Sequence, residues 1–478
     1  MSTKELVAVL WGNEIGRLTR DRNGRLRFTY ADAWRTRDDA IPLSLSMPLA
    51  AQEHGHKPVS AFLWGLLPDN EVVLRRWGQR FQVSARNAFA LIANVGEDCA
   101  GAAQFVRPER LDAVLAGGPM EVEWLDDEGI AERLRLLRED RGAWRGPSDT
   151  GQFSLSGAQA KTAFLLEGGR FGVPSGRTPT THILKPPLRE FPGHVENEHF
   201  CMALARELGL ATATSEVRRF GDELAVVVTR YDRARTAELA AEAAARAAAA
   251  ATRAAGESDV AAAALEAAAA AADAAALGEL AESQPILRLH QEDTCQALAI
   301  EPTSKYQHEG GPSPGQIAEL LRGSSSSPME DVAAFVDALG YNWIIAGTDA
   351  HAKNYSLLLA ARGQVRLAPL YDLASALPYP SLEPPRLRLA MKIGSTYRIR
   401  DIQGRHWRAL CQALRIDESE TIGRFDAMAA GAEHRVGDLG ARMIEEGLDA
   451  EVVDRLVDRI GGRARACRKL LADVSRPE

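Results

Sequence analysis

Hydrophobic residues in the first third of the chain fall into short runs, some alternating with polar residues and others recurring at helical spacing. Period-two alternation, and apolar runs around a turn at Asn13, predict strands at residues 6–11, 16–19 and 26–30. Helical spacing predicts helices at residues 62–67, before the turn Pro68-Asp69-Asn70, and at 127–138. Gly146-Pro147-Ser148 then marks a boundary, so residues 1–146 are expected to form an N-terminal α/β domain.

The next segment, residues 147–234, is expected to be a β-rich lobe, because its apolar runs are short and bounded by glycine and proline. Strands are predicted at residues 152–155, 163–166, 181–185 and 224–231. Between the last two, residues 195–209 have helical periodicity and end at Gly209.

Residues 241–280 differ in composition from the rest of the chain, since twenty-four of these forty residues are alanine. Alanine is the best helix former, so two helices broken near residues 256–259 are predicted. The tract offers little surface for a strong core, which favours an inserted helical hairpin or arm over residues 235–283. A specific docking arm is the functional alternative.

The remainder, residues 284–478, is predicted to be a largely helical lobe. Its helices are expected at residues 331–345, 406–415, 422–430, 433–446 and 451–471. A β-rich segment followed by a helical one is the order required of a fold that holds a nucleotide between a sheet lobe and a helical lobe.

Composition narrows the class of protein. A net charge of −8 and a pI of about 5.8 argue against a protein whose own surface holds nucleic acid electrostatically. No secretory signal and no long uncharged apolar run are recognised, so neither secretion nor a membrane location is expected. The five scattered cysteines include no CxxC pair and no zinc spacing, which favours a reduced, cytoplasmic protein.

The candidate chemistry centres on Asp349, Asn354 and Asp372. An Asp, an Asn five residues later and a second Asp about twenty residues further on form the layout of a phosphoryl-transfer site. In such a site the first Asp orients the acceptor hydroxyl, and the other two residues hold Mg²⁺, which prefers oxygen ligands. The alternative is a loop in which Asp and Asn only occupy turn positions.

A kinase also needs a cation for the ATP phosphates, a loop over them and a hinge for adenine. Lys185 closes a predicted strand about thirty residues after the start of the small-residue loop 154–162, whose backbone amides could approach an anion. Thr229-Arg230-Tyr231, at the end of a buried strand, is the candidate hinge. A surface lysine and an ordinary strand end are the structural alternatives.

The motifs taken together resemble the HipA family of serine/threonine kinase toxins, over nearly the whole chain outside the alanine tract. The matching segments are residues 42–49, 66–70, 154–162, 181–185, 196–198, 230–233, 289–293, 305–306, 310–312, 348–354 and 370–372. The resemblance implies an α+β fold: a kinase-like two-lobed structure with an N-terminal α/β domain, a β-rich nucleotide lobe and a helical C-terminal lobe.

The resemblance also implies roles for individual residues, with ATP and Mg²⁺ as cofactors. Asp349 would be the catalytic Asp, Asn354 and Asp372 the metal ligands, and Lys185 the phosphate contact. The nucleotide pocket would be lined by His351, Gln291 and Tyr371 and by the hinge backbone from Thr229 through Arg230 to Tyr231. Ser154 would be the residue that the kinase phosphorylates on itself, which switches it off, with Ser156 as the rival acceptor.

The partners that the resemblance implies are a small HipB-like helix-turn-helix antitoxin, through which the complex would bind operator DNA, and an aminoacyl-tRNA synthetase as the protein substrate, notably glutamyl-tRNA synthetase. Two other hypotheses of function remain. One is a corepressor subunit with secondary or no kinase activity, and the other is a small-molecule kinase on a similar scaffold. The intact Asp349, Asn354, Asp372 and Lys185 favour an active kinase.

Overall fold

The computed structural model describes residues 4–116, 122–140, 154–175, 178–254, 285–382 and 384–472, with isolated positions between 268 and 278. It forms two compact units, each described separately below. The first comprises Met1–Arg230 and His290–Glu478, and the second comprises Tyr231–Leu289.

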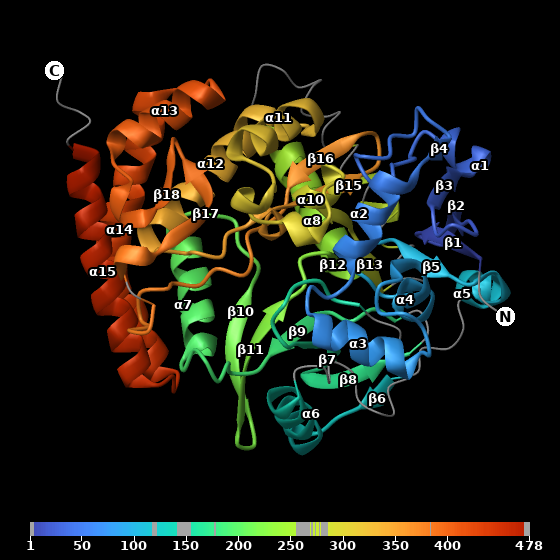
Figure 1. Cartoon of the computed structure of the whole chain (residues 1–478), viewed down its shortest axis with the longest axis horizontal. Helices are drawn as coiled ribbons and strands as arrows, with labels where there is room; N and C mark the ends of the chain where they lie inside the picture. The colour runs from blue at the N-terminus through green and yellow to red at the C-terminus, as the bar shows by residue number, and fades with distance from the viewer. Residues whose placement is uncertain are drawn as a thin grey trace. The chain divides into compact units, whose positions relative to one another are not determined.

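The first unit begins with an antiparallel five-stranded sheet in the order β4-β3-β2-β1-β5 (Figure 1). Its strands are β1 (Glu5–Leu10), β2 (Asn13–Arg20), β3 (Leu26–Tyr30), β4 (Glu53–His54) and β5 (Gln104–Val106). The accompanying helices are α1 (Asp32–Arg35), α2 (His56–Leu66), α3 (Glu71–Arg80), α4 (Ala88–Val95) and α5 (Leu111–Ala116). Strand β1 is buried on both faces, since residues 6–10 are all inaccessible to solvent. On one face Val7, Val9 and Val106 pack with Val114.

A six-stranded sheet follows, in the order β10-β11-β9-β7-β8-β6. Its strands are β6 (Val122–Trp124), β7 (Thr162–Glu167), β8 (Arg170–Pro174), β9 (His182–Lys185), β10 (Ser215–Phe220) and β11 (Glu223–Thr229). Helix α6 (Asp127–Glu139) buries Ile130, Ala131 and Leu134 against this sheet. Helix α7 (His194–Glu207) contacts β10 and β11 and is buried along most of its length.

The C-terminal part of the first unit is mostly helical. Its helices are α10 (Thr294–Ala297), α11 (Pro314–Ser324), α12 (Pro328–Ile345), α13 (Gly404–Leu414), α14 (Glu418–Glu445) and α15 (Ala450–Ala472). It also contains a three-stranded sheet and a hairpin, with strands β14 (His290–Asp293), β15 (Ser356–Ala360), β16 (Gln364–Leu367), β17 (Arg388–Ile393) and β18 (Thr396–Arg398). Helices α14 and α15 pack side by side (Figure 1).

The motif at residues 42–49 ties the N-terminal sheet region to the C-terminal part. Glu292 on β14 accepts hydrogen bonds from Ser44 Oγ at 2.5 Å and from the Leu45 amide at 2.7 Å. His290 Nε2 lies 3.0 Å from Leu43 O, and Gln296 Nε2 donates to Phe62 O at 2.9 Å. Burial raises the pKa of Glu292 to about 8, although the hydrogen bonds from Leu45 and Ser44 favour its charged form.

The second unit contains β12 (Arg233–Arg235) and β13 (Ile286–Arg288), which pair antiparallel, and α8 (Thr236–Ala254). Helix α8 covers the start of the alanine-rich tract, in keeping with alanine's helix propensity. The second helix predicted for this tract falls mainly outside the described residues.

Several predicted elements differ from the structure. Residues 422–430 and 433–446 are not two helices but one, α14. Gly431, which lies between the two predicted ranges, packs closely against the end of α7, since a Cβ there would lie 2.7 Å from Leu208 Cδ2. Residues 154 and 155 of the predicted strand 152–155 lie in a loop, and residues 152 and 153 fall outside the described part of the chain. The strands β14–β18 were not predicted, because each is short and lies between helices.

Candidate active site

The segment that carries Asp349 and Asn354 is a tight loop after α12. Ala346 ends the helix in the left-handed region at φ 53°, and a Cβ on Gly347 would lie 2.2 Å from Asn342 Oδ1, so glycine is required for the chain to turn there. Asn354 Nδ2 donates to Asp349 O at 2.8 Å. The five-residue spacing read from the sequence therefore brings the two residues into direct contact.

The carboxylate of Asp349 accepts a hydrogen bond from the hydroxyl of Tyr306. Burial and the charge of Asp349 both raise the pKa of Tyr306, which keeps its proton in place. The ring of Tyr306 also makes an edge contact with His351, at 5.1 Å between centroids. In a kinase, the catalytic Asp must accept a hydrogen bond from the acceptor hydroxyl, and the Tyr306 hydroxyl makes the same kind of contact with Asp349. A role for Tyr306 was not predicted from the sequence.

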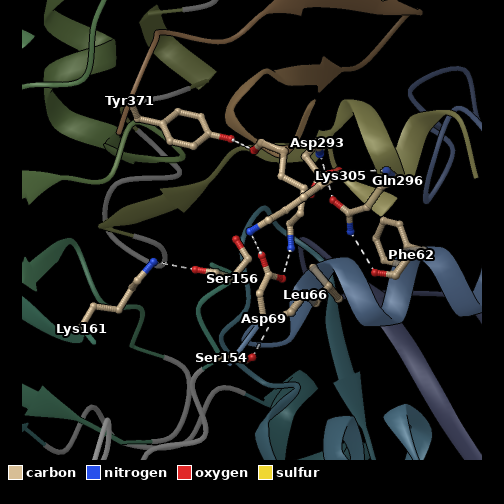
Figure 2. Close-up of polar contacts among 11 residues, drawn as sticks. Phe62, Leu66, Asp69, Ser154, Ser156, Lys161, Asp293, Gln296, Lys305 and Tyr371 are labelled. Carbon is tan, nitrogen blue, oxygen red and sulfur yellow. Dashed lines mark hydrogen bonds and ion pairs between the residues drawn. The ribbon is translucent and has the colours of Figure 1, made fainter. Parts of the chain in front are cut away.

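Asp372 is held in a left-handed conformation, at φ 55°, by contacts on both sides. The preceding Leu370 exchanges backbone hydrogen bonds of 2.8 Å with Ala211 and Ala213. The Tyr371 hydroxyl donates to Lys353 O at 2.6 Å and lies 2.7 Å from Ser356 Oγ, which ties this segment to the loop of Asp349 (Figure 2). The structure thus joins two segments that the sequence separates by about twenty residues.

Lys185, at the end of β9, is buried between two carboxylates. Its Nζ lies 2.6 Å from Glu198 Oε1 on α7 and also pairs with Asp372. Burial disfavours the lysine's charge, but Asp372 and Glu198 outweigh it and raise the pKa of Lys185. A buried strand lysine paired with a helix glutamate is the arrangement that positions nucleotide phosphates in kinases. Glu198 was not singled out, although a carboxylate on the helix after the lysine strand was a usable signal.

The loop over the site is held down by the segment from Leu66 to Asn70. Ser154 is fully buried, its amide donating to Asp98 O at 3.0 Å and its Oγ to Leu66 O at 2.7 Å. Gly157 O accepts from the Asp69 amide at 3.0 Å. Ser156 is half-buried, and its carbonyl accepts from Lys161 Nζ at 2.7 Å (Figure 2).

Lys161 is a second buried cation of the site that the sequence did not reveal. Burial lowers its pKa to about 8, partly offset by the charge of Asp372. The charges of Asp372 and Glu198 raise the pKa of Lys161 and that of Lys185 lowers it, so the protonation of Lys161 depends on the same charged groups that surround Lys185.

Asp69 links the N-terminal region to the loop of Asp349. Its carboxylate lies between two ammonium groups, 2.9 Å from Lys305 Nζ and 2.7 Å from Lys353 Nζ (Figure 2). Burial opposes its ionisation, but the two lysines prevail and hold the pKa of Asp69 at about 2. Because Lys353 precedes Asn354 and Lys305 precedes Tyr306, one carboxylate fixes both sides of the Asp349 pocket.

The other predicted nucleotide contacts occupy separate positions. Gln291 lies on β14, opposite Leu358. The Arg230 guanidinium is buried and donates to Thr180 Oγ1 and to Cys99 O, so its side chain has a structural use. Thr229 closes β11, and Tyr231 begins the second unit, so a hinge at 229–231 stays a prediction.

The residues present fit a magnesium ion bound together with phosphates. No group of three or more His, Cys, Asp and Glu side chains converges as a metal cage within the described residues. Asn354 and Asp372 instead offer one amide and one carboxylate oxygen, and Mg²⁺ typically takes one or two protein ligands plus waters and phosphates. His351 Nδ1 and Glu198 Oε2 are buried without a hydrogen-bond partner, which is consistent with a missing polar ligand nearby.

Comparison with known proteins assigns the family. Residues 153–436 match the HipA-like C-terminal domain, and residues 6–106 match the HipA N-terminal domain. The chain belongs to the HipA family. It is 32% identical to a Sinorhizobium fredii protein named "Putative kinase Y4mE", over 98% of this chain and 99% of the relative. It is 26% identical to the serine/threonine-protein kinase toxin HipA of Shewanella oneidensis, over 84% of this chain and 81% of the relative.

The fold agrees with this assignment. The solved complex of Shewanella oneidensis HipA with HipB and operator DNA contains a chain that matches with a TM-score of 0.77 at 24% identity, covering 99% of this chain and all of that chain. The predicted α+β, kinase-like fold is confirmed, and the protein is a HipA-family kinase. In the described part of the chain, no helix is long and apolar enough to cross a membrane.

Proposed function

We propose that this protein is an Mg-ATP-dependent serine/threonine protein kinase and the toxin of a type II toxin–antitoxin pair. The observation that carries the proposal is the ion-paired chain Glu198–Lys185–Asp372, tied through Tyr371 to the loop of Asp349 and Asn354. Together these residues would supply the phosphate cation, the metal ligands and the base that phosphoryl transfer requires.

In this mechanism Lys185, oriented by Glu198, binds the ATP phosphates, and Lys161 adds a second positive charge from the loop. Asp349 accepts a hydrogen bond from the acceptor hydroxyl and takes up its proton as the new O–P bond forms and the γ-phosphate leaves ADP. Mg²⁺, held by Asn354 and Asp372, would neutralise the phosphate oxygens. His351, whose pKa burial lowers to about 4, is neutral and available as a hydrogen-bonding group.

Self-phosphorylation of Ser154 is proposed as the off switch. Its Oγ now donates to Leu66 O in a fully buried position. A phosphoserine has no proton at Oγ to donate and carries about −1.5 to −2 charges, so it cannot remain facing a carbonyl in that position. Phosphorylation of Ser154 therefore requires the loop 154–162 to move away from Leu66, and the phosphate then prevents the loop from packing there again. Ser156, which is less buried, is the rival acceptor.

The partners follow from the family. A HipB-like helix-turn-helix antitoxin is proposed, with operator DNA bound mainly through it. The Shewanella oneidensis structure, a complex of HipA, HipB and operator DNA, supports this proposal. An aminoacyl-tRNA synthetase such as glutamyl-tRNA synthetase is the proposed cytoplasmic substrate. A corepressor subunit with little kinase activity is the alternative, supported by the same complex.

The proposal is tested by incubating the purified protein with labelled ATP and magnesium and locating phosphate by mass spectrometry. We expect phosphate on Ser154, none after chelation of Mg²⁺, and a Ser154→Ala protein that still phosphorylates a substrate but is not self-inactivated. Phosphate found only on Ser156 would show that Ser154 is not the residue that switches the kinase off. If the wild-type protein transferred no phosphate at all, the kinase proposal would fail and the corepressor hypothesis would remain.

A further inference from the structure

The hairpin β17–β18 and its flanks form a basic surface on an otherwise acidic chain. Residues 386–408 contain seven arginines and lysines but one acidic residue, Asp401, whereas the whole chain carries a net charge of −8. Arg388 and Arg398 are exposed and face each other directly across the hairpin. Like charges at opposed positions destabilise a strand pair, so the repulsion between these two arginines lowers the stability of the hairpin. A bound anion would offset this repulsion.

The basic residues of this surface are only partly neutralised by carboxylates, since Arg400 pairs with Asp401 at 3.4 Å. Among the described residues, no carboxylate forms an ion pair with Arg388, Arg398 or Arg405, although Arg408 pairs with Glu418 at 2.7 Å. Lys392 Nζ lies 5.3 Å from the centroid of the Tyr397 ring, which adds an aromatic face beside the charges. We call Arg388, Lys392, Tyr397, Arg398 and Arg405 the basic hairpin surface.

The basic hairpin surface is connected to Asp349 through the segment 306–308. The Lys392 amide donates to Gln307 Oε1 at 2.7 Å. His308, which follows Gln307, packs edge-on against Tyr397, with 6.0 Å between the ring centroids. His308 in turn lies 5.7 Å from Tyr306, which donates to Asp349. Two ring contacts thus connect the hairpin to the point where the acceptor hydroxyl must bind.

We propose that the basic hairpin surface docks an acidic segment of the protein substrate, next to the serine or threonine that receives the phosphate. This inference rests on the proposed function. An acidic peptide is favoured over nucleic acid because the proposed function makes the acceptor a serine or threonine of a protein, and because the chain as a whole carries a net charge of −8, which disfavours nucleic acid. Opposite charge would also steer the substrate to this side of the active site.

The test uses the full-length protein and two matched serine peptides, one with a run of glutamates and one with glutamines in the same places. Wild type is compared with R388A/R398A and with the control R25A/R459A, which removes two exposed arginines elsewhere. We expect wild type to prefer the acidic peptide in kcat/KM by roughly three- to tenfold at low salt, the range for two exposed ion pairs. R388A/R398A should lose that preference and keep its KM for ATP, whereas the control should retain both.

Peptide binding is measured separately by fluorescence anisotropy, together with a DNA duplex and an RNA hairpin. Binding of the acidic peptide that depends on Arg388 and Arg398 supports the inference even if no phosphate is transferred, in which case the proposed function alone fails. Equal affinity of wild type for the two peptides overturns the inference. So does arginine-dependent binding of a nucleic acid without any acidic-peptide preference, which would make the hairpin a nucleic-acid surface.

Discussion

Lys185 sits where three parts of the fold meet: it ends β9, pairs with Glu198 on α7 and reaches Asp372 beyond β16. Removing one partner of a buried ion pair leaves the other charge uncompensated, so each of these residues depends on the other two. The site is therefore sensitive to single substitutions that preserve shape but remove charge.

The first prediction concerns Glu198→Gln. Without its carboxylate, Lys185 is held by Asp372 alone and is drawn away from the phosphates. We expect kcat/KM for ATP to fall by roughly tenfold to hundredfold, or about 1.4–2.7 kcal/mol. The control is Glu196→Gln, on the same helix, where burial already raises the carboxyl's pKa and neutrality costs little. Equal activity of the two variants would contradict the assigned role.

Lys161 gives a prediction about pH. Its pKa of about 8 in the free protein should rise when anionic phosphates bind beside it, so nucleotide binding should take up a proton above pH 8 and weaken as the pH rises further. At pH 8.5, calorimetry in two buffers of different ionisation heat should show uptake of roughly half a proton or more. The uptake should vanish in Lys161→Met. Release of a proton on nucleotide binding, or the same proton uptake in Lys161→Met as in wild type, would show that Lys161 does not lie beside the bound phosphates.

At the scale of elements, the loop 154–162 and the loop of Asp349 are both fixed by the turn after α2. Asp69 contributes its amide to Gly157 O and its carboxylate to Lys305 and Lys353. The N-terminal motif at residues 66–70 is thereby joined to both loops of the candidate site.

Asp69→Asn tests this link. The substitution keeps the shape but removes the carboxylate that pairs with the buried Lys353 and the partly buried Lys305, so unfolding free energy should fall by about 3 kcal/mol and kcat should drop as well. Urea unfolding and steady-state kinetics measure the two effects, with the exposed Asp38→Asn as control. Wild-type stability and kcat in Asp69→Asn would show that the two lysines do not need this carboxylate.

Elements and site residues could be predicted from the sequence where the pattern that defines them lies within a few consecutive residues. Residues 26–30 alternate clearly and form β3 as expected, and Asp349 and Asn354 share one short loop whose spacing brings them together. Glu198 lies on the helix that follows the lysine strand, a signal that was not used, whereas Tyr306 acts through a tertiary contact that no local pattern encodes. Gly431 lies inside α14, where two helices were predicted, and its small size fits Leu208 of a distant segment.

At the scale of the whole molecule, the first compact unit contains every proposed site residue except Tyr231. The alanine-rich tract at residues 241–280 lies in the second unit, between segments that match the family. A tract that supplies no proposed site residue should be dispensable for chemistry.

Replacement of residues 241–280 by a short Gly/Ser linker is therefore predicted to preserve ATP affinity and kcat within about twofold, or roughly 0.4 kcal/mol. Nucleotide binding by calorimetry and phosphate transfer are the measurements, and the thermal midpoint serves as a check on folding. A large loss of ATP binding in a protein that remains folded would show that the tract supports the site.

The central claim is that Asp349 is the base of a phosphoryl-transfer site whose nucleotide contacts lie on other residues. The most direct measurement compares wild type with Asp349→Asn for transfer of labelled γ-phosphate, with ATP affinity measured in parallel. The variant keeps the side chain's shape but cannot accept the hydroxyl proton. We expect transfer to fall by at least about a hundredfold while ATP affinity and thermal stability stay near wild type. Wild-type transfer by the Asp349→Asn protein would contradict the account.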